Sequence, residues 1–155
     1  MKKGFTLIEL LVVIAIIGIL AAIVFVRLDT VRAKGRDAKR ISDIGQLQIA
    51  FEAYFEAHNA YPATLSFALV TEGFIPAIPT DPSGGGYYYS GLIDVNGLCK
   101  NYHLGVNLEQ TNEVLAGDAD APASQTACSG GRNFSGSDTT KCNGSSGGRC
   151  FDKRR

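Results

Sequence analysis

The chain contains two successive patterns of apolar and polar positions. Across residues 5–26 only Thr6 and Glu9 are polar. As a helix this segment would be about 33 Å long, enough to cross a hydrocarbon core of about 30 Å. Across residues 27–58 the apolar residues recur mostly at steps of three or four, which is the period of an amphipathic helix. This apolar stripe consists of Leu28, Val31, Ala38, Ile41, Ile44, Leu47, Phe51, Tyr54, Phe55 and His58.

The two patterns are predicted to form one continuous helix. No proline occurs between Phe5 and Tyr61, so the helix is expected to extend over about 55 residues and about 80 Å. Asn59 suits a left-handed helix cap, and Pro62 disfavours continuation beyond Tyr61. The first half, apolar on all sides, indicates lipid or the core of a filament. The second half, apolar on one side, indicates packing against a soluble domain.

Residues 60–155 are sufficient for one modest hydrophobic core. The pattern predicts a short helix over residues 65–72 and strands over residues 87–92, 102–108 and 113–115. Beyond Gly117 the chain is rich in glycine and small polar residues, which predicts long loops. We therefore predict an α+β fold, with one long N-terminal helix packed on a small antiparallel sheet and a loop-rich C-terminal region.

Glu9 is the informative residue of the first segment. A carboxylate in an apolar segment costs several kcal/mol unless it finds a partner, so it marks a functional site. A cleaved secretory signal would end near Ala21 and Ala22, but the apolar residues continue to Val26. A simple membrane anchor would accommodate the length. Both alternatives leave Glu9 unexplained.

The residues around Glu9 resemble a known family. Gly4-Phe5-Thr6-Leu7-Ile8-Glu9-Leu10-Leu11, after a short basic leader with Lys2 and Lys3, is similar to the leader junction of type IV pilins and type II secretion pseudopilins. The resemblance implies that a membrane-bound prepilin peptidase cleaves between Gly4 and Phe5 and methylates the new amine. It also implies that subunits stack into a helical filament. Glu9 of an incoming subunit would then pair with the Phe5 amine of a neighbour and set the axial register.

The segment after the helix resembles the same family. Asn59-Ala60-Tyr61-Pro62, Gly73-Phe74-Ile75-Pro76, Ile78-Pro79-Thr80-Asp81-Pro82 and Tyr87-Tyr88-Tyr89 are similar to the helix exit and following loop of the major pseudopilin. The resemblance weakens after Gly117, where the calcium-binding loop of typical major pseudopilins would fall. Asp118 and Asp120 alone do not make an oxygen cage, so a solvated acidic turn is the preferred interpretation and no metal is predicted.

The four cysteines lie outside the N-terminal helix. An even number in a region poor in core residues predicts disulfides among Cys99, Cys128, Cys142 and Cys150, formed in an oxidising compartment. Three pairings fit the sequence. Zinc is disfavoured although His103 follows Cys99 closely, because there is no C-x-x-C motif. His58 is expected to pack on the helix stripe, and His103 is expected to face solvent or a local acceptor.

Charge separates the remaining classes of function. The net charge is +0, which argues against nucleic-acid binding by the whole protein. The cations after the apolar segment would place the head in the cytoplasm by the positive-inside rule, whereas the leader and the cysteines favour the exterior. We expect these cations to form a solvated helix face or ion pairs between subunits. The two basic clusters are Arg27, Arg32, Lys34, Arg36, Lys39 and Arg40, and Lys153, Arg154 and Arg155.

Catalytic motifs such as G-x-S-x-G, a phosphate-binding P-loop and H-E-x-x-H are absent from the sequence, so neither an enzyme nor a cofactor is predicted. The predicted organisation is a leader (residues 1–4), a membrane or filament-core helix (5–26), its amphipathic continuation (27–59) and an extracytoplasmic head (60–155). The predicted function is a pilus-like filament subunit, most similar to a type II secretion pseudopilin. It would span the inner membrane once and then join an extracytoplasmic filament, with the prepilin peptidase and the assembly machinery as partners.

Two alternatives remain open. One is a minor pilin that binds DNA or a surface through the C-terminal basic cluster, and the other is a membrane-anchored extracytoplasmic domain that does not polymerise. Neither secretion, motility, adhesion nor DNA uptake is favoured by the sequence.

Overall fold

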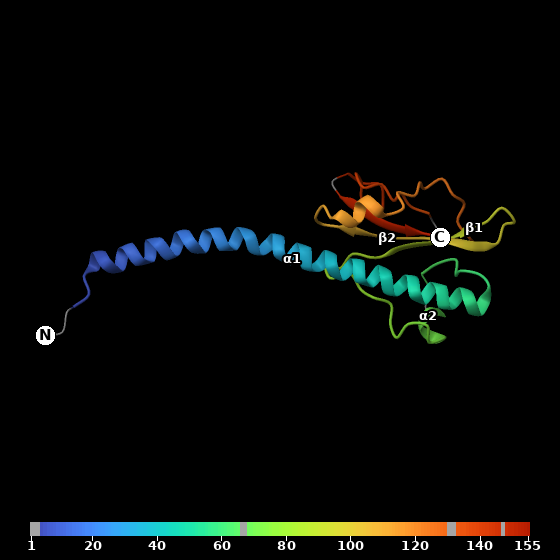
Figure 1. Ribbon diagram of the computed structural model, residues 1–155, viewed down its shortest axis with the longest axis horizontal. Coiled ribbons are helices and arrows are strands. Elements are labelled where there is room, and N and C mark those ends of the chain that lie inside the picture. The colour runs from blue at the N-terminus through green and yellow to red at the C-terminus, as the bar shows by residue number, and fades with distance from the viewer. Residues whose placement is uncertain (1–3, 66–67, 130–132, 147) are drawn as a thin grey trace. The chain divides into compact units, whose positions relative to one another are not determined.

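A computed structural model describes residues 4–65, 68–129, 133–146 and 148–155 of the chain. In chain order the elements are α1 (Leu7–His58), α2 (Ala68–Thr71), β1 (Tyr88–Ile93), β2 (Cys99–Leu108), the 3-10 helix η1 (Glu113–Gly117) and β3 (Arg149–Arg154) (Figure 1). The chain divides into two compact units, Met1–Gly35 and Arg36–Arg155. The leader lysines Lys2 and Lys3 lie outside the described residues.

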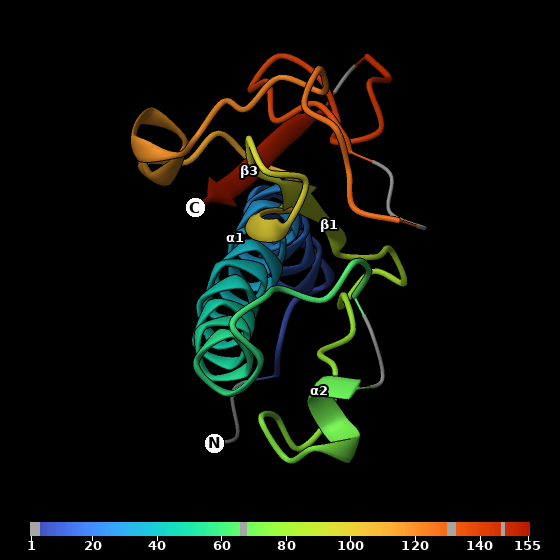
Figure 2. The same cartoon turned by 90° about the vertical axis from the view of Figure 1, so that its right-hand side faces the viewer.

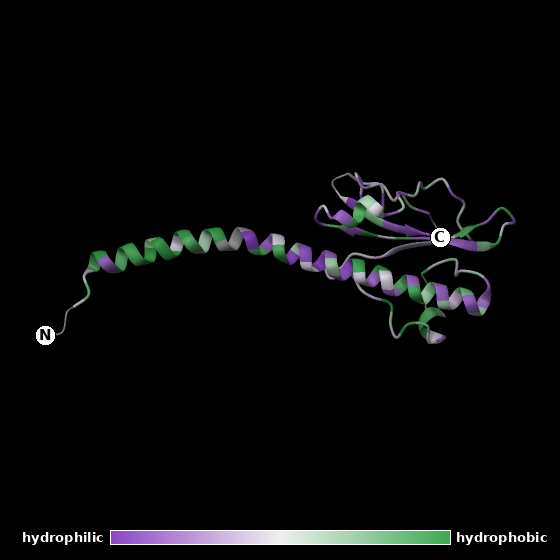
Figure 3. Cartoon of the chain, viewed as in Figure 1, coloured by the Kyte–Doolittle hydropathy of each residue, from purple (hydrophilic) through white to green (hydrophobic). Residues whose placement is uncertain are grey.

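The first unit carries the apolar part of α1. The helix is continuous through Gly18, and hydrophobic residues dominate this part of it (Figure 3). Large apolar side chains here are exposed, for example Leu7 at 81% and Ile19 at 65%. Among the described residues, α1 is the one helix long and apolar enough to cross a membrane by length and composition. The predicted long helix is therefore confirmed.

The second unit is organised around the part of α1 that follows Gly35. Ile44, Leu47 and Phe51 are fully buried and share a core with Leu104 and Val106 of β2. The Phe51 ring stacks on Tyr89 of β1 with 4.2 Å between centroids. Figures 1 and 2 show the sheet on one side of this part of α1 and α2 on the other. One stripe of the helix thus supplies the core, as the 3.6-residue period requires.

The sheet has three antiparallel strands in the order β1-β2-β3. Tyr89 pairs with Leu104, and Val106 pairs with Phe151. β1 and β2 confirm two predicted strands, although β2 begins three residues earlier than expected. The third prediction, a strand over residues 113–115, is wrong, because Asn112 caps a 3-10 helix there by accepting a hydrogen bond from the Val114 amide.

β3 lies in the region predicted to be loops, so that prediction is wrong for residues 149–154. Apolar and polar residues do not alternate regularly along β3, and its buried residues include a charged one, Asp152. The strand is nevertheless fixed by a full ladder of pairs with β2 from His103 to Leu108. Burial of Asp152 depends on a partner on another strand, which local hydrophobicity cannot reveal.

The helix ends as the sequence predicts. Asn59 adopts a left-handed conformation (φ 51) and its amide donates to the Phe55 carbonyl at 2.7 Å. The Lys100 Nζ donates to the Asn59 side-chain oxygen at 2.7 Å, which places a cation at the helix C-terminus. α2 is shorter than the predicted helix over residues 65–72, of which residues 66–67 lie outside the described chain.

All four cysteines form disulfides within the chain, Cys99 with Cys128 and Cys142 with Cys150. No thiol is left to bind zinc. The first bond ties the start of β2 to the loop before residue 129, and the second ties a loop to β3. Phe134, Cys142 and Cys150 form a small second core with Tyr88. The disulfides therefore stabilise a region with few apolar residues.

Candidate functional site

The proposed cleavage and assembly residues lie at the start of α1. Gly4 and Phe5 precede the helix and are exposed, and Glu9 lies in its first turn. Glu9 Oε2 accepts hydrogen bonds from the Thr6 amide at 2.9 Å and the Thr6 hydroxyl at 2.7 Å. The Glu9 amide donates to the Thr6 hydroxyl at 3.3 Å. Thr6-Leu7-Ile8-Glu9 is therefore a capping box, a T-x-x-E signal that could have been read from the sequence.

The capping box satisfies hydrogen bonds but supplies no counter-charge. Thr6 is neutral, so its hydrogen bonds satisfy part of the lone pairs of the Glu9 carboxylate without contributing a positive charge. A free α-amine at Phe5, if cleavage created one, would be a group of the right charge close by in the sequence. The geometry thus leaves Glu9 able to pair with a cation from another molecule.

The helix cations form the predicted solvated face only in part: Arg27, Arg32, Lys34 and Lys39 are exposed, whereas Arg36 is half-buried and Arg40 is buried. Arg40 is 3% exposed and donates to both oxygens of Asp81, at 2.6 and 3.0 Å. It also donates to Asp37 and Glu109, each at 2.7 Å. Lys39 pairs with Asp43 at 2.6 Å. The expectation of solvated or intersubunit charges is wrong for Arg40, because its partners lie within the same chain: Asp37 one helical turn away, and Asp81 and Glu109 on distant segments.

This buried network joins three segments of the second unit. Asp37 of α1 accepts hydrogen bonds from the amides of Glu109 and Gln110, just after β2, at 3.0 and 2.9 Å. Arg36 donates to Glu109 at 2.8 Å, and this hydrogen bond lowers the pKa of Glu109 to about 2. The hydrogen bond from Arg40 lowers the pKa of Asp81 below its ordinary value. These charges hold α1, the loop around residue 81 and the end of β2 together.

The C-terminal basic cluster is also partly used within the chain. The Arg155 guanidinium bonds to Glu52 and the Tyr61 hydroxyl and lies over the Phe55 ring, 4.9 Å from its centroid. Lys153 donates to the Gly117 carbonyl at 3.1 Å. Two of the three cations thus have intramolecular contacts, which weakens the alternative of a DNA-binding tail.

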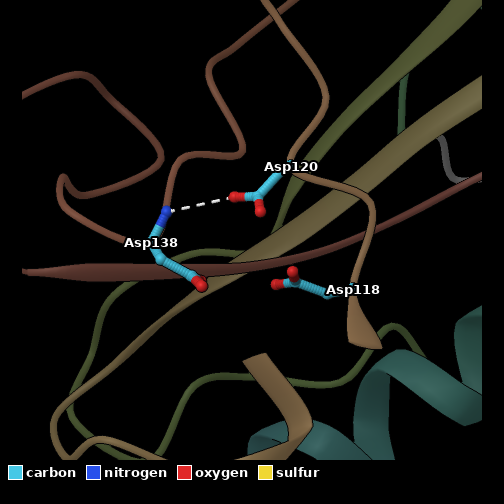
Figure 4. Close-up of side chains that lie close together, drawn as sticks. All are labelled: Asp118, Asp120 and Asp138. Carbon is cyan, nitrogen blue, oxygen red and sulfur yellow. Dashed lines mark hydrogen bonds between the residues drawn. The ribbon is translucent and has the colours of Figure 1, made fainter. Parts of the chain in front are cut away.

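Three carboxylates gather at the loops beside β3. One oxygen from each of Asp118, Asp120 and Asp138 lies within 4.8 Å of the others (Figure 4). Asp118 Oδ1 and Asp138 Oδ1 are buried and accept no hydrogen bond from any residue that the structure describes. Burial raises the pKa of Asp118 to about 6, and Asp152, Asp138 and Asp120 add to the rise.

The preferred interpretation of a simple solvated acidic turn is therefore incomplete. Sequence reasoning identified Asp118 and Asp120 but missed Asp138, which comes from a separate loop. Carboxylate oxygens are ligands of hard divalent cations such as Ca²⁺, and two buried oxygens without donors fit such an ion.

The two histidines differ in their surroundings. The His58 ring stacks on Tyr54, with 4.0 Å between ring centroids, as expected for helix packing, and its Nε2 lies 3.1 Å from Glu72. His103 is completely buried and bonded to Asp152, so of the two expectations for His103 the local acceptor is correct.

Comparison with known proteins gives one family model at the N-terminus and several similar proteins. Residues 1–25 match the family model described as the prokaryotic N-terminal methylation motif. Type II secretion system core protein G of Pectobacterium carotovorum subsp. carotovorum is 37% identical over 101 residues, covering 56% of this chain and 65% of that protein. The protein of the same name from Vibrio cholerae is 36% identical over 136 residues, covering 76% of this chain and 89% of its own.

A shorter similarity reaches the pilins. Type IV major fimbrial protein FimA of Dichelobacter nodosus is 46% identical over 52 residues, 34% of this chain and 33% of that protein. No solved structure was found to match the chain.

The methylation motif, the apolar helix and the α+β head define a prepilin-type protein anchored in a membrane by its N-terminal helix. Within this class, the chain belongs to the family of type II secretion system core protein G, the major pseudopilins. The chain spans slightly less than two thirds of the Pectobacterium protein.

Proposed function

We propose that this chain is the repeating structural subunit of a secretion-type filament and that it is processed by a prepilin peptidase between Gly4 and Phe5. The carrying observation is the apolar segment at the start of α1, in which Glu9 is the one carboxylate and lies in the first turn, close to the proposed cleavage point. The methylation motif and the pseudopilin and fimbrial relatives support the same role. The names of these relatives describe secretion and fimbrial proteins, which supports a non-enzymatic function.

Assembly depends on polar pairing more than on apolar burial. Lipid is already apolar, so moving the helix from the bilayer into a bundle gains little from the hydrophobic effect. Cleavage after Gly4 would create an amine at Phe5. The Glu9 carboxylate, oriented by Thr6, would form an ion pair with the Phe5 amine of a neighbouring subunit, and this pair would set the axial register.

The head would lie outside the cytoplasm. Two disulfides are expected to persist in an oxidising compartment, which supports this orientation. The positive-inside rule points the other way, but the rule is statistical.

The test replaces Glu9 by valine. We expect Glu9→Val to insert into the membrane and to be cleaved normally, while the yield of sheared filaments falls at least tenfold. Immunoblots of membrane and filament fractions, with mass spectrometry of the N-terminus, measure these effects. Glu56→Gln, at an exposed helix position, is the matched control. Wild-type filament yield from the Glu9→Val strain would overturn the assembly mechanism.

A second candidate function is calcium binding in the head. The two buried carboxylate oxygens of Asp118 and Asp138 favour it, and Asp120 would add a third carboxylate ligand. Calcium would offset most of the negative charge of the three carboxylates and connect their two loops. We expect millimolar calcium to raise the Tm of the purified wild-type chain by several degrees and to leave Asp138→Asn unchanged. Glu113→Gln, at an exposed acidic position, should show the same rise in Tm as the wild type. If calcium raised the Tm of Asp138→Asn as much as that of the wild type, this site would be excluded.

A further inference from the structure

A fully buried histidine–aspartate pair lies next to the carboxylate cluster. His103 on β2 and Asp152 on β3 are both 0% exposed, and His103 Nε2 lies 2.6 Å from Asp152 Oδ2. Burial of such polar groups is costly unless several hydrogen bonds compensate it. Neither filament assembly nor the helix ion pairs use these residues, so the pair requires its own explanation.

Asp152 contacts the loop that carries two of the three cluster residues. Its Oδ1 accepts from the Asp120 amide at 3.0 Å, and its Oδ2 accepts from the Ala121 amide at 3.1 Å. Its own amide donates to Asp118 Oδ2 at 3.2 Å, and its carbonyl accepts from the Ala119 amide at 3.2 Å. Asp152 therefore bonds to each residue from 118 to 121 and fixes the direction of this loop.

Both oxygens of the Asp152 carboxylate accept hydrogen bonds from these donors. Oδ1 serves a backbone amide, and Oδ2 serves a backbone amide and the His103 ring. Its role is thus distinct from that of Asp118 and Asp138, which each keep one oxygen that accepts no hydrogen bond from the described residues. Asp152 orients the ligand loop instead of acting as a ligand.

His103 connects Asp152 to a second loop, residues 133–138, which carries the third cluster residue, Asp138. Its Nδ1 lies 2.8 Å from Asn133 Oδ1, and its ring stacks on Phe134 with centroids 3.7 Å apart. The Asn133 amide group donates to the carbonyls of Pro122 and Gln125 at 3.4 and 3.3 Å, which orients its oxygen toward His103. Five residues after Asn133 the chain reaches Asp138.

The second loop passes directly over the pair. The Gly136 amide donates to the Ala121 carbonyl at 2.9 Å, and a Cβ at Gly136 would overlap the Asp152 carboxylate. The Asp138 amide donates to Asp120 Oδ1 at 3.3 Å. Both loops that carry the cluster residues therefore pack on the same buried pair, His103 and Asp152.

We propose that His103 and Asp152 are the positioning pair of the divalent-cation site formed by Asp118, Asp120 and Asp138. This inference rests on the calcium site proposed above. The pair holds the two loops at the separation that brings their oxygens together before the ion binds. Outer residues that orient metal ligands typically contribute 10–100-fold to metal affinity.

The experiment measures calcium affinity of the full mature chain in detergent micelles by isothermal titration calorimetry. His103→Phe keeps an aromatic ring against Phe134 but removes both polar contacts, and Asp152→Asn keeps the shape of the side chain. We expect both variants to bind calcium at least tenfold more weakly than the wild type. Asp138→Asn should not bind, and Glu113→Gln should bind like the wild type.

A second readout separates positioning from general stability. Hydrogen exchange of the Asp120 and Ala121 amides without calcium should accelerate in His103→Phe, while exchange in the α1 core around Leu47 stays slow. If the variants do not fold, exchange in the wild type decides, since calcium should then slow exchange at Asp120 and Ala121 and an unchanged rate would overturn the proposal.

The outcomes distinguish the two levels of the proposal. A wild-type chain that does not bind calcium removes the calcium site, and the positioning role falls with it. A wild-type chain that binds calcium with the same affinity as His103→Phe and Asp152→Asn keeps the site but overturns the positioning pair.

Discussion

At the scale of single residues, the available donors determine what each acidic side chain does. Glu9 accepts from Thr6 and closes the first turn of α1. Asp37 accepts from Arg40 and from two backbone amides and is 1% exposed. Asp118 and Asp138 each retain a buried oxygen that finds no donor in the part of the chain that the structure describes. The same functional group therefore serves as a helix cap, a structural link and a candidate ligand.

Arg40 provides the sharpest residue-scale prediction. Arg40→Leu would leave Asp37 and Asp81 buried without their cation, and loss of one partner of a buried pair costs about 3–5 kcal/mol. We expect a loss of this size in the free energy of unfolding, measured by chemical denaturation of the purified chain. Arg40→Lys should retain part of the stability, because it keeps the charge but loses the bidentate geometry.

The control for Arg40 is an exposed pair on the same helix. Arg32 and Asp29 lie 3.9 Å apart with side chains 69% and 87% exposed. Arg32→Leu should change stability by less than about 0.5 kcal/mol, as is usual for surface ion pairs. Equal losses for Arg40→Leu and Arg32→Leu would show that the buried network does not stabilise the head.

At the scale of elements, local signals were sufficient for α1, its cap at Asn59 and the strands β1 and β2. Each of these depends on periodicity or on a single backbone preference. The same signals failed where charged residues are buried. The buried face of α1 continues from Leu47 and Ile44 back to Arg40 and Asp37 at helical spacing, but the charged residues looked like a solvent face.

The candidate site was predictable to a similar extent. Glu9 and the cysteines stand out from their surroundings in the sequence, whereas the pairing of the cysteines does not. Asp138 and the His103–Asp152 pair could not be predicted, because their partners lie 18 to 49 residues away and meet only through β3 and its loops.

The junction of α1 with the end of β2 should be sensitive to acid. The hydrogen bond from Arg36 lowers the pKa of Glu109 to about 2 from an ordinary value of 4.5. A carboxyl group whose pKa is lowered in the folded state stabilises that state at pH values above its ordinary pKa. This stability is lost as the pH falls toward 2. The unfolding midpoint of the wild type should therefore decrease between about pH 5 and pH 2.

Glu109→Gln tests this assignment. The variant should be less stable at neutral pH and should lose less stability over the same pH interval, as followed by denaturant unfolding at several pH values. Glu113→Gln, at an exposed position in η1, should keep the wild-type slope. A wild-type slope in Glu109→Gln would assign the acid sensitivity to other carboxyl groups.

At the scale of the whole molecule, polymerisation distinguishes a filament subunit from an anchored domain that remains single. All native cysteines are in disulfides, so one cysteine introduced into the apolar helix would be the one free thiol of the chain. Ile16, 52% exposed on α1, is a suitable position because its side chain is available to a neighbouring helix.

We expect Ile16→Cys to form covalent dimers in assembling cells after mild oxidation, and we expect Glu9→Val to reduce their yield in the same background. Non-reducing electrophoresis of membrane and filament fractions measures both effects. Apolar contact alone would give random collisions that Glu9→Val leaves unchanged, whereas register set by a carboxylate–amine pair requires Glu9. Equal dimer yields with and without Glu9, or none at native abundance, would favour the anchored domain.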